Sequence, residues 1–428
     1  MKGKIIELTN SLYEEKQELG IYLHIPFCIK KCDYCDFLSA PATDEVINTY
    51  FDAMMTEIDS YSGKTGDYIV KTVFFGGGTP SCVKPHYIKK FMEAISRVFT
   101  IDREQLEATI EINPGTINEE KLLIYREAGI NRLSFGLQSA DNKDLSILGR
   151  IHTYEQFIEN YQLARSLGFD NINIDLMSAL PGQTVSAWES TLNKVIALKP
   201  EHISAYSLII EEGTKFYDRY YKEAKGYEEL PEEETDRLIY HKTKEILERF
   251  GYYRYEISNY ALKRHGNEGT YECRHNCSYW IGTDYLGIGL GASSLINGAR
   301  FSNMDDIIKY IDRCNQYKGN RSKTNMEQNN YMLMKPMNRD LIGIRLNYEC
   351  LTKEQKMEEF MILGLRMCAG VSKRMFSQRF GIELEDVFST VLEQLQKKQL
   401  IEIQDDRIHL SDFGIDVSNT VLADFLLN

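Results

Sequence analysis

The chain has no apolar run long enough to cross a membrane, and its first 20 residues lack the apolar stretch of a signal peptide. Basic residues are also scarce, since 50 Lys and Arg stand against 63 Asp and Glu, for a net charge of −13. Nucleic-acid binding relies on Lys and Arg to neutralise phosphates, so this deficit argues against nucleic acid as a partner. We therefore expect a cytoplasmic protein with reduced thiols and with small-molecule or protein partners.

Three of the nine cysteines are clustered directly after a strand-like apolar run. Cys28, Cys32 and Cys35 have the spacing C-x3-C-x2-C and follow Ile21–Ile25. Three thiolates from one loop can hold three irons of a [4Fe–4S] cluster and leave the fourth iron open for chemistry. An open iron can be chelated by the amino and carboxylate groups of S-adenosylmethionine. The spacing resembles that of the radical SAM superfamily.

Two other interpretations of the cysteines stay open at this point. A structural zinc ion needs four ligands, and the fourth would come from the segment Cys273-Arg-His275-Asn-Cys277. Alternatively, the three thiols are incidental core residues, because free cysteine behaves as a small hydrophobe.

Short β-branched or aromatic runs alternate with amphipathic segments over the first 250 residues, which predicts parallel strands with crossover helices. Polar or glycine-rich residues follow the carboxyl end of each expected strand, which favours an α/β fold of the partial (β/α)6 barrel type with an open side. A doubly wound sheet is the alternative. We expect strands near 21–25, 71–75, 108–112, 132–137, 171–176 and 202–208, and helices over 45–61, 85–99, 118–128, 153–167, 186–198 and 233–250.

The pattern changes after Gly251, so we divide the chain into a barrel (1–250), an α+β extension (251–355) and a C-terminal domain (356–428). In the extension we expect a strand over Tyr252–Ser258, a glycine-dense stretch over Asp284–Ser293 that approaches a ligand or a neighbouring strand, and an exposed polar insertion over Gln316–Arg339. Expected helices over 357–369, 373–380 and 384–397, followed by a hairpin over 401–410 that turns at Asp405-Asp406, resemble a winged-helix module. Its acidic balance favours a packing role over DNA binding.

Several motifs offer binding groups. The segment Gly76-Gly77-Gly78-Thr79-Pro80 has neither the Lys-Ser/Thr of a P-loop nor a G-x-G-x-x-G pattern, so it predicts either backbone approach to a methionine-type ligand or a tight turn. Glu111 and Asp175 are interpreted as ribose and ammonium acceptors rather than as an acid/base pair. Gln138 and Arg150 can hold an adenosyl group or a carboxylate.

The segment His275-Asn276-Cys277-Ser278-Tyr279-Trp280 combines an imidazole, an amide and two large aromatic rings. The aromatic pair can flank a flat ligand, and the imidazole or a neighbouring thiolate can ligate a porphyrin iron. His275, Cys273 and Cys277 all stay open as the axial ligand.

Longer strings resemble the oxygen-independent coproporphyrinogen III oxidase family and, within it, the HemW-type branch of radical SAM haem chaperones. These strings are IYLHIPFC (21–28), GGGTP (76–80), EINPGT (111–116), NRLSFGLQS (131–139), LGRIH (148–152), DLMSALPGQT (175–184), EHISAYSLIIEEGT (201–214), RYEISNYA (254–261) and RHNCSYW (274–280).

The resemblance implies a set of cofactors and site residues. Cys28, Cys32 and Cys35 would hold the [4Fe–4S] cluster, and three residues would contact the cluster-bound S-adenosylmethionine, namely Tyr22, Gly77 and Glu111. A second adenosyl position would be lined by Tyr34, Gly78, Thr79, Gln138, Arg150 and Asp175. The branch carries an HN-x-x-YW haem-associated signature, which is matched by His275, Asn276, Tyr279 and Trp280.

Two departures favour the chaperone over the oxidase. The oxidase pattern has a further cysteine two residues after the third ligand, where this chain has Phe37, and a long segment ahead of the cluster, which this chain lacks. We therefore expect no coproporphyrinogen dehydrogenase activity. The expected partners are haem, acceptor haemoproteins at a membrane surface and an electron-donor protein, with no nucleic acid. A zinc-stabilised structural or DNA-binding protein is a third class that rests on the thiols and the C-terminal module.

Overall fold

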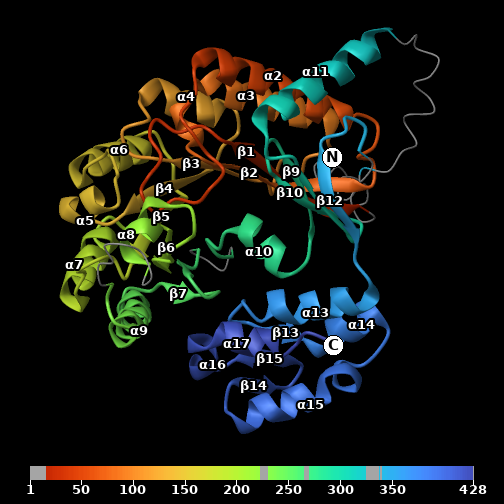
Figure 1. Ribbon diagram of the computed structural model, residues 1–428. Helices are drawn as coiled ribbons and strands as arrows, with labels where there is room; N and C mark the ends of the chain where they lie inside the picture. The colour runs from red at the N-terminus through yellow and green to blue at the C-terminus, as the bar shows by residue number, and fades with distance from the viewer. Residues whose placement is uncertain (1–15, 222–229, 265–268, 324–336, 338–339, 428) are drawn as a thin grey trace, which may run out of the picture.

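The computed structural model describes residues 16–221, 230–264, 269–323, 337 and 340–427. Six parallel strands form a curved sheet, and helices cover its outer face (Figure 1). The strands are β1 (Gln17–Ile25), β2 (Tyr68–Gly77), β3 (Glu107–Ile112), β4 (Arg132–Gln138), β5 (Ile172–Ser178) and β6 (His202–Ser207). The connecting elements are α2 (Asp44–Ser60), the 3-10 turn η1 (Pro80–Cys82), α3 (Pro85–Val98), α4 (Glu119–Glu127), α5 (Asn142–Ile147), α6 (Tyr154–Ser166) and α7 (Val185–Ile196). This arrangement confirms the expected partial barrel.

The sheet continues at both edges, so the extension is part of the barrel's own sheet. The strand order is β12-β11-β10-β9-β1-β2-β3-β4-β5-β6-β8-β7, with β9 parallel to β1. The added strands are β7 (Tyr253–Arg254), β8 (Asn259–Ala261), β9 (Asp284–Ile288), β10 (Ser293–Ile296), β11 (Ala299–Asn303) and β12 (Arg345–Cys350). Four further helices accompany them, α8 (Lys215–Tyr220), α9 (Glu233–Arg249), α10 (Arg274–Trp280) and α11 (Ile307–Lys323).

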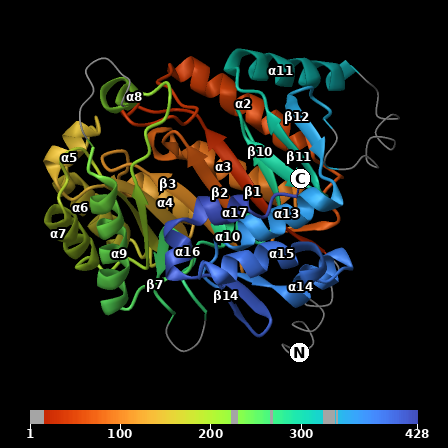
Figure 2. The ribbon, with the colours of Figure 1, turned by 60° about the horizontal axis from the view of Figure 1, so that its bottom comes forward.

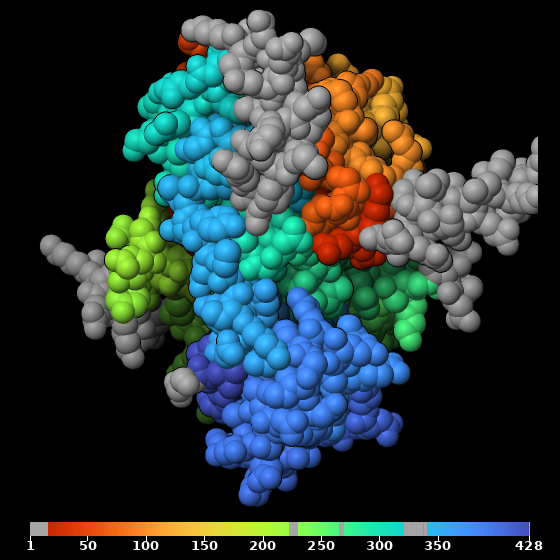
Figure 3. Space-filling view, turned by 90° about the vertical axis from the view of Figure 1, so that its right-hand side faces the viewer, coloured from red at the N-terminus to blue at the C-terminus, as the bar shows by residue number. Residues whose placement is uncertain are grey.

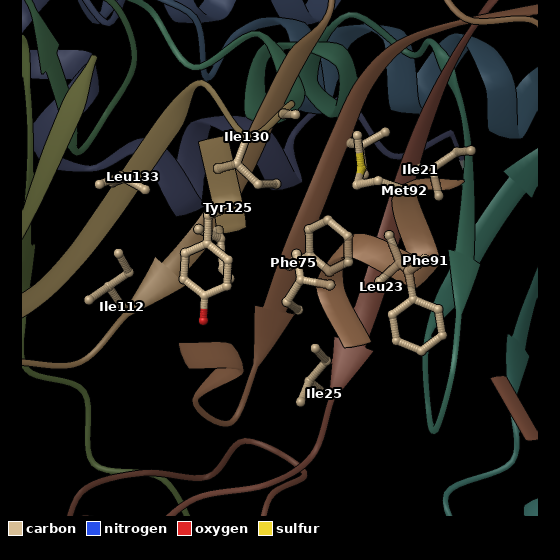
Figure 4. Close-up of a cluster of buried hydrophobic side chains, with 14 of the residues drawn as sticks. Ile21, Leu23, Ile25, Phe75, Phe91, Met92, Ile112, Tyr125, Ile130 and Leu133 are labelled. Atoms are coloured by element: carbon tan, nitrogen blue, oxygen red, sulfur yellow. The ribbon is translucent and has the colours of Figure 1, made fainter. Parts of the chain in front are cut away.

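Successive side chains of a strand point to opposite faces of a sheet, so every second residue packs against the outer helices and the residues between them face the barrel interior. Leu23 on β1 and Phe75 on β2 pack outward against Phe91 and Met92 of α3 (Figure 4). Burying each such large side chain contributes about 1.5–3 kcal/mol. Their neighbours Tyr22 and Phe74 point inward and line a cavity. The apolar runs of the strands therefore fix which residues face the interior.

Two expectations for the extension need correction. The strand expected over Tyr252–Ser258 is only Tyr253–Arg254, because the Tyr255 N–H bonds to the carbonyl of Asn259 and the chain turns there. The insertion expected over Gln316–Arg339 is helical up to Lys323 as the end of α11, while 324–336 and 338–339 lie outside the described residues. The expected close approach of the glycine-dense stretch is confirmed, since a Cβ on Gly287 of β9 would collide with the Ser293 carbonyl of β10.

The C-terminal domain has its own hydrophobic core and forms a separate lobe in the space-filling view (Figure 3). Three helices precede the hairpin, as expected, and Asp405 at the turn has φ +50°. Cys368 donates a backbone hydrogen bond to Tyr255, and Arg254 and Lys244 both pair with Asp412, so the domain is fastened to the barrel beside β7 and α9 (Figure 2). Its elements are α13 (Lys353–Gly364), β13 (Val371–Ser372), α14 (Lys373–Phe380), α15 (Leu384–Lys397), β14 (Ile401–Gln404), β15 (Arg407–Leu410), α16 (Asp412–Asp416) and α17 (Ser418–Ala423).

Among the described residues, no helix is both long and apolar enough to span a bilayer.

Candidate cofactor site and barrel cavity

The cysteine loop lies at the carboxyl end of β1, above the barrel interior. Cys28, Cys32 and Cys35 open on one pocket of about 120 Å³. The Cys28 N–H donates to Ala40 and the Cys35 N–H to Cys32, which bends the loop back over the strand. Three thiols that face one pocket from a single short loop fit the ligand set of a [4Fe–4S] cluster.

Asp33 anchors this loop and was not singled out from the sequence. Its carboxylate pairs with Lys215 at 2.8 Å and Arg219 at 3.4 Å, both on α8. Its backbone N–H donates to Leu148, and its carbonyl accepts from Phe216. A lone aspartate between two cysteines gives no sequence signal for this role, because its partners lie far along the chain.

Close packing requires glycine at Gly77, the last residue of β2, and at Gly78 directly after it. A Cβ on Gly78 would lie 2.7 Å from the Phe27 carbonyl oxygen and 3.0 Å from Cys28 Sγ. Gly77 has φ +113°, a conformation that favours glycine, and a Cβ there would meet the His24 ring at 2.7 Å. Both glycines line the pocket with the cysteines. The segment therefore serves as a tight turn and also lets its backbone approach the cofactor pocket.

Two carboxyl groups, those of Glu111 and Asp175, line the same pocket. Glu111 accepts the Gly77 N–H at 3.2 Å, and burial together with the nearby Asp175 raises the Glu111 pKa to about 8. Asp175 accepts hydrogen bonds from Asn173 at 2.8 Å and Ser134 at 3.2 Å, and burial raises its pKa. No ion pair of the described residues involves either group. Carboxyl groups that form no ion pair fit a cationic ligand such as an ammonium or sulfonium group.

Arg150 and Gln138 also line the cofactor pocket. Arg150 donates to Asn113 Oδ1 at 2.7 Å and to the Gly136 carbonyl, and its Nη1 lies 3.6 Å from Cys32 Sγ. Gln138 has φ +71° at the end of β4, a strained conformation of the kind that clusters at functional sites. Tyr34 and Thr79 complete the lining, and Thr79 Oγ1 lies 3.5 Å from Cys28 Sγ. Tyr22 lines the adjoining cavity instead.

That adjoining cavity has a volume of about 340 Å³ and runs through the barrel beneath the cofactor pocket. Tyr34, Phe37, Glu111, Ser134, Gln138 and Asp175 line both spaces, so they share a boundary. At the opposite end, the lining includes His275, Asn276 and Tyr279 of α10. The structure therefore brings the cysteine loop and three residues of the RHNCSYW segment to opposite ends of one interior.

His275 is held firmly at this end of the cavity, which we call the floor. It is 1% exposed, its Nδ1 lies 2.8 Å from Thr72 Oγ1, and its Nε2 lies 2.8 Å from the Tyr279 hydroxyl. Burial and the positive charge of Arg132 lower the pKa of His275 to about 3, so the ring is neutral. Both ring nitrogens are engaged, so iron ligation by His275 requires one of these two hydrogen bonds to open.

The two sulfur candidates lie outside the cavity lining. Cys273 is fully buried, and its thiol lies 3.8 Å from Glu107 Oε1. Burial raises the pKa of Cys273 to about 12 and also raises that of Cys277, so both are protonated thiols. Of the three axial candidates, only His275 borders the interior.

Trp280 is separated from the other residues of its motif. It borders a crevice between α10 and α13, and the Arg366 guanidinium lies 4.5 Å from its ring centroid. Tyr279 faces the barrel cavity instead. Consecutive residues on a helix do not face the same direction, so the expectation that both rings flank one flat ligand is not met.

Comparison with known proteins identifies both the barrel and the C-terminal domain. Residues 22–195 match the radical SAM superfamily and residues 351–417 the HemN C-terminal domain. The haem chaperone HemW of Bacillus subtilis is 36% identical over 405 residues, which cover 95% of this chain and 98% of that protein. The HemW of Lactococcus lactis is 33% identical over 408 residues, with 95% and 97% coverage.

The solved structure of coproporphyrinogen III oxidase HemN from Escherichia coli has the same fold, with a TM-score of 0.75 at 21% identity, over 99% of this chain and 93% of that one. At this identity the likeness concerns the fold alone. The full-length match to the HemW proteins, together with both domain matches, shows that the chain belongs to the HemW family of the radical SAM superfamily.

Proposed function

We propose that this protein is a haem chaperone that binds a [4Fe–4S] cluster, S-adenosylmethionine and haem, and delivers haem to acceptor haemoproteins in the cytoplasm. The observation that carries the proposal is the shared interior, which has the cysteine loop at one end and His275, Asn276 and Tyr279 at the other. Haem held in this interior would be close to the cofactors. The names of the relatives at 33–36% identity support the same function.

Each end of the interior has a separate role in the proposal. Cys28, Cys32 and Cys35 would hold the cluster, and Glu111 with the Gly77–Gly78 backbone would bind the cationic end of S-adenosylmethionine. When bound, the cluster would give this site the capacity to pass an electron, received from an electron-donor protein, to S-adenosylmethionine. Gln138, Arg150 and Asp175 would line a second adenosyl position. The aromatic walls would exclude water from the haem.

Decarboxylation of coproporphyrinogen III is the competing function, because the oxidase has the same fold. Phe37 stands where the oxidase pattern has another cysteine, and it is 62% exposed at the edge of the cofactor pocket. This apolar ring replaces the thiol of that pattern with a group that offers no acid, base or ligand. The substitution favours the chaperone.

One experiment separates the two functions. The full chain is reconstituted with iron and sulfide without oxygen, loaded with haem, and mixed with an apo-haemoprotein whose Soret band differs from that of the donor. We expect haem transfer to the acceptor. In parallel, incubation with reductant, S-adenosylmethionine and coproporphyrinogen III should give no protoporphyrinogen above the level of the Cys28→Ala variant. Failure to bind haem, or turnover above that level, would contradict the proposal.

A further inference from the structure

Arg132 is a buried cation at the floor of the barrel cavity. It is the first residue of β4, and its charge acts on Glu107 and His275, which are joined by the hydrogen bond that fastens α10. Its side chain is 2% exposed, yet it borders the cavity. Among the residues that line this cavity, Arg132 is the one that carries a fixed positive charge, because the His275 ring is neutral.

The guanidinium of Arg132 has no hydrogen-bond or ion-pair partner among the described residues, and its Nε is fully buried and unpaired. Removing a guanidinium from water without such partners is costly. Arginine also has five N–H donors in a planar fork that suits a carboxylate. The unused donors therefore indicate that the site is completed by a ligand.

The nearby acidic groups use their oxygens elsewhere. Glu107 accepts the backbone N–H groups of Arg274 and His275, each at 3.0 Å. Asp175 accepts from Asn173 and Ser134. Burial lowers the pKa of Arg132, but Glu107 and Asp175 act on it through space, and its pKa stays above the usual value. These carboxylates balance the charge of Arg132, but the N–H donors of its guanidinium still have no hydrogen-bond acceptor within the described part of the chain.

The aromatic side chains that line the cavity near Arg132 indicate the shape and polarity of the rest of the ligand. Four aromatic rings rise along one side from the floor: the Phe74 ring lies 5.1 Å from His275 and 6.2 Å from Tyr22, and the His275 ring lies 5.0 Å from Tyr279. Such a wall favours a flat, apolar ligand. An aromatic wall with one cation at its base suits a ring system that bears an acidic side chain.

We propose that Arg132 binds a carboxylate of the molecule held in the barrel, so that a planar tetrapyrrole enters with one propionate side chain at the floor and the opposite edge of the ring toward the cysteine loop. This inference rests on the proposed haem binding and adds the residue that sets the ligand's orientation. Arg132 is a binding residue here, and no bond is made or broken.

The test compares haem with its dimethyl ester, in which the propionates carry no charge. Both are titrated into anaerobically reconstituted full-length protein and followed by the Soret band. We expect the wild type to bind haem at least about tenfold more tightly than the ester, the effect of one charge-assisted hydrogen-bonded pair. Arg132→Gln should bind both probes equally, with an affinity near that of the wild type for the ester.

Arg274→Gln is the matched control, because Arg274 is exposed outside the cavity and donates to the Gln105 carbonyl. It should keep the preference for haem over the ester. Equal affinities of the wild type for both probes, or a preference that survives in Arg132→Gln, would overturn the role of Arg132 while haem binding stands. Binding of neither probe would contradict the proposed function as well.

Iron content and circular dichroism show whether Arg132→Gln is folded. If it is not, Arg132→Lys takes its place, since it keeps the charge and loses the fork. A reduced preference for haem over the ester in the Lys variant supports the proposal, and an unchanged preference contradicts it.

Discussion

The Nδ1 atom of His275 lies 2.8 Å from Oγ1 of Thr72, and this hydrogen bond joins α10 to the floor of the barrel between residues 203 positions apart. Gly20 makes room for it, since a Cβ there would lie 3.1 Å from Thr72 Oγ1 and 3.5 Å from the His275 ring. The haem-associated segment is therefore a structural part of the barrel as well as a wall of its cavity.

A pH dependence of stability follows from this burial. Burial, with the charge of Arg132, lowers the pKa of His275 to about 3, below the value of about 6.5 in an unfolded chain. The unfolded state therefore takes up a proton below pH 6.5 that the folded state excludes, and the free energy of unfolding falls as the pH drops toward 3. At pH 5.5 this loss is about 1.4 kcal/mol.

His275→Gln should remove that part of the pH dependence. The free energy of unfolding is measured in urea at pH 7.5 and 5.5 for both proteins, and the difference between the two pH values should be smaller in the variant by about 1.4 kcal/mol. Other buried histidines such as His202 contribute equally to both proteins. Parallel pH profiles would show that His275 titrates normally.

The cysteine loop gives a second prediction, which uses a neighbouring thiol as its control. Cys32→Ala should abolish the oxygen-labile brown chromophore and the content of about four irons per chain expected of a [4Fe–4S] cluster. Cys82→Ala should leave both unchanged. The Cys82 thiol donates toward the Phe27 carbonyl at 3.5 Å, and burial raises its pKa to about 11, so it is no thiolate ligand. Stoichiometric zinc without a chromophore in the wild type would refute the cluster.

A third prediction tests the packing of the glycine turn. Gly78→Ala would place a methyl group 2.7 Å from the Phe27 carbonyl and 3.0 Å from Cys28 Sγ, so the turn and the loop must move apart. Such overpacking costs about 1–3 kcal/mol. We expect S-adenosylmethionine affinity, measured by calorimetry on the reconstituted protein, to fall at least about tenfold.

Gly66→Ala is the control for this change, since nothing lies within 4 Å of a Cβ at that exposed position. It should bind S-adenosylmethionine as the wild type does. Unaltered binding in Gly78→Ala would mean that the loop relaxes without consequence for the cofactor pocket.

The barrel could be predicted from the sequence because its strands are short, apolar and separated by helices. Arg132–Leu137 was expected as a strand and is β4 up to Gln138. On β3, β4 and β5, one polar residue stands between two apolar residues in the sequence, namely Glu111, Ser134 and Asp175. This pattern indicates that the three polar side chains face the barrel interior. Local pattern therefore sufficed for the part of the site at the carboxyl ends of the strands.

The floor of the cavity could not be predicted in this way. Glu107 and Arg132 are the first residues of β3 and β4, and Thr72 pairs with Glu107 on the neighbouring strand. This end of a barrel usually serves stability, and α10 begins 142 positions after Arg132. No local signal indicates such a contact. The separation of Tyr279 from Trp280 was within reach of the sequence, however, because neighbouring residues on a helix diverge.

The last prediction concerns the contact between Trp280 and Arg366, which joins the barrel to the C-terminal domain. Because a partly buried cation–π pair contributes about 1 kcal/mol, Arg366→Met should weaken the docking of the domain by about that amount. The chain has two tryptophans, and Trp188 on α7 is buried against Thr243 of α9, so a Trp188→Phe background leaves Trp280 as the fluorescent reporter.

In that background, the Trp280 emission of Arg366→Met should shift to the red at a lower urea concentration than that of the parent, as the indole meets water. Arg374→Met, an exposed position on α14, is the control and should follow the parent. Since Trp280 lies outside the barrel cavity, Arg366→Met should also leave the haem Soret band unchanged. Coincident urea transitions in all three proteins would show that the stack contributes nothing to docking, and an altered Soret band would place the C-terminal domain in contact with the haem.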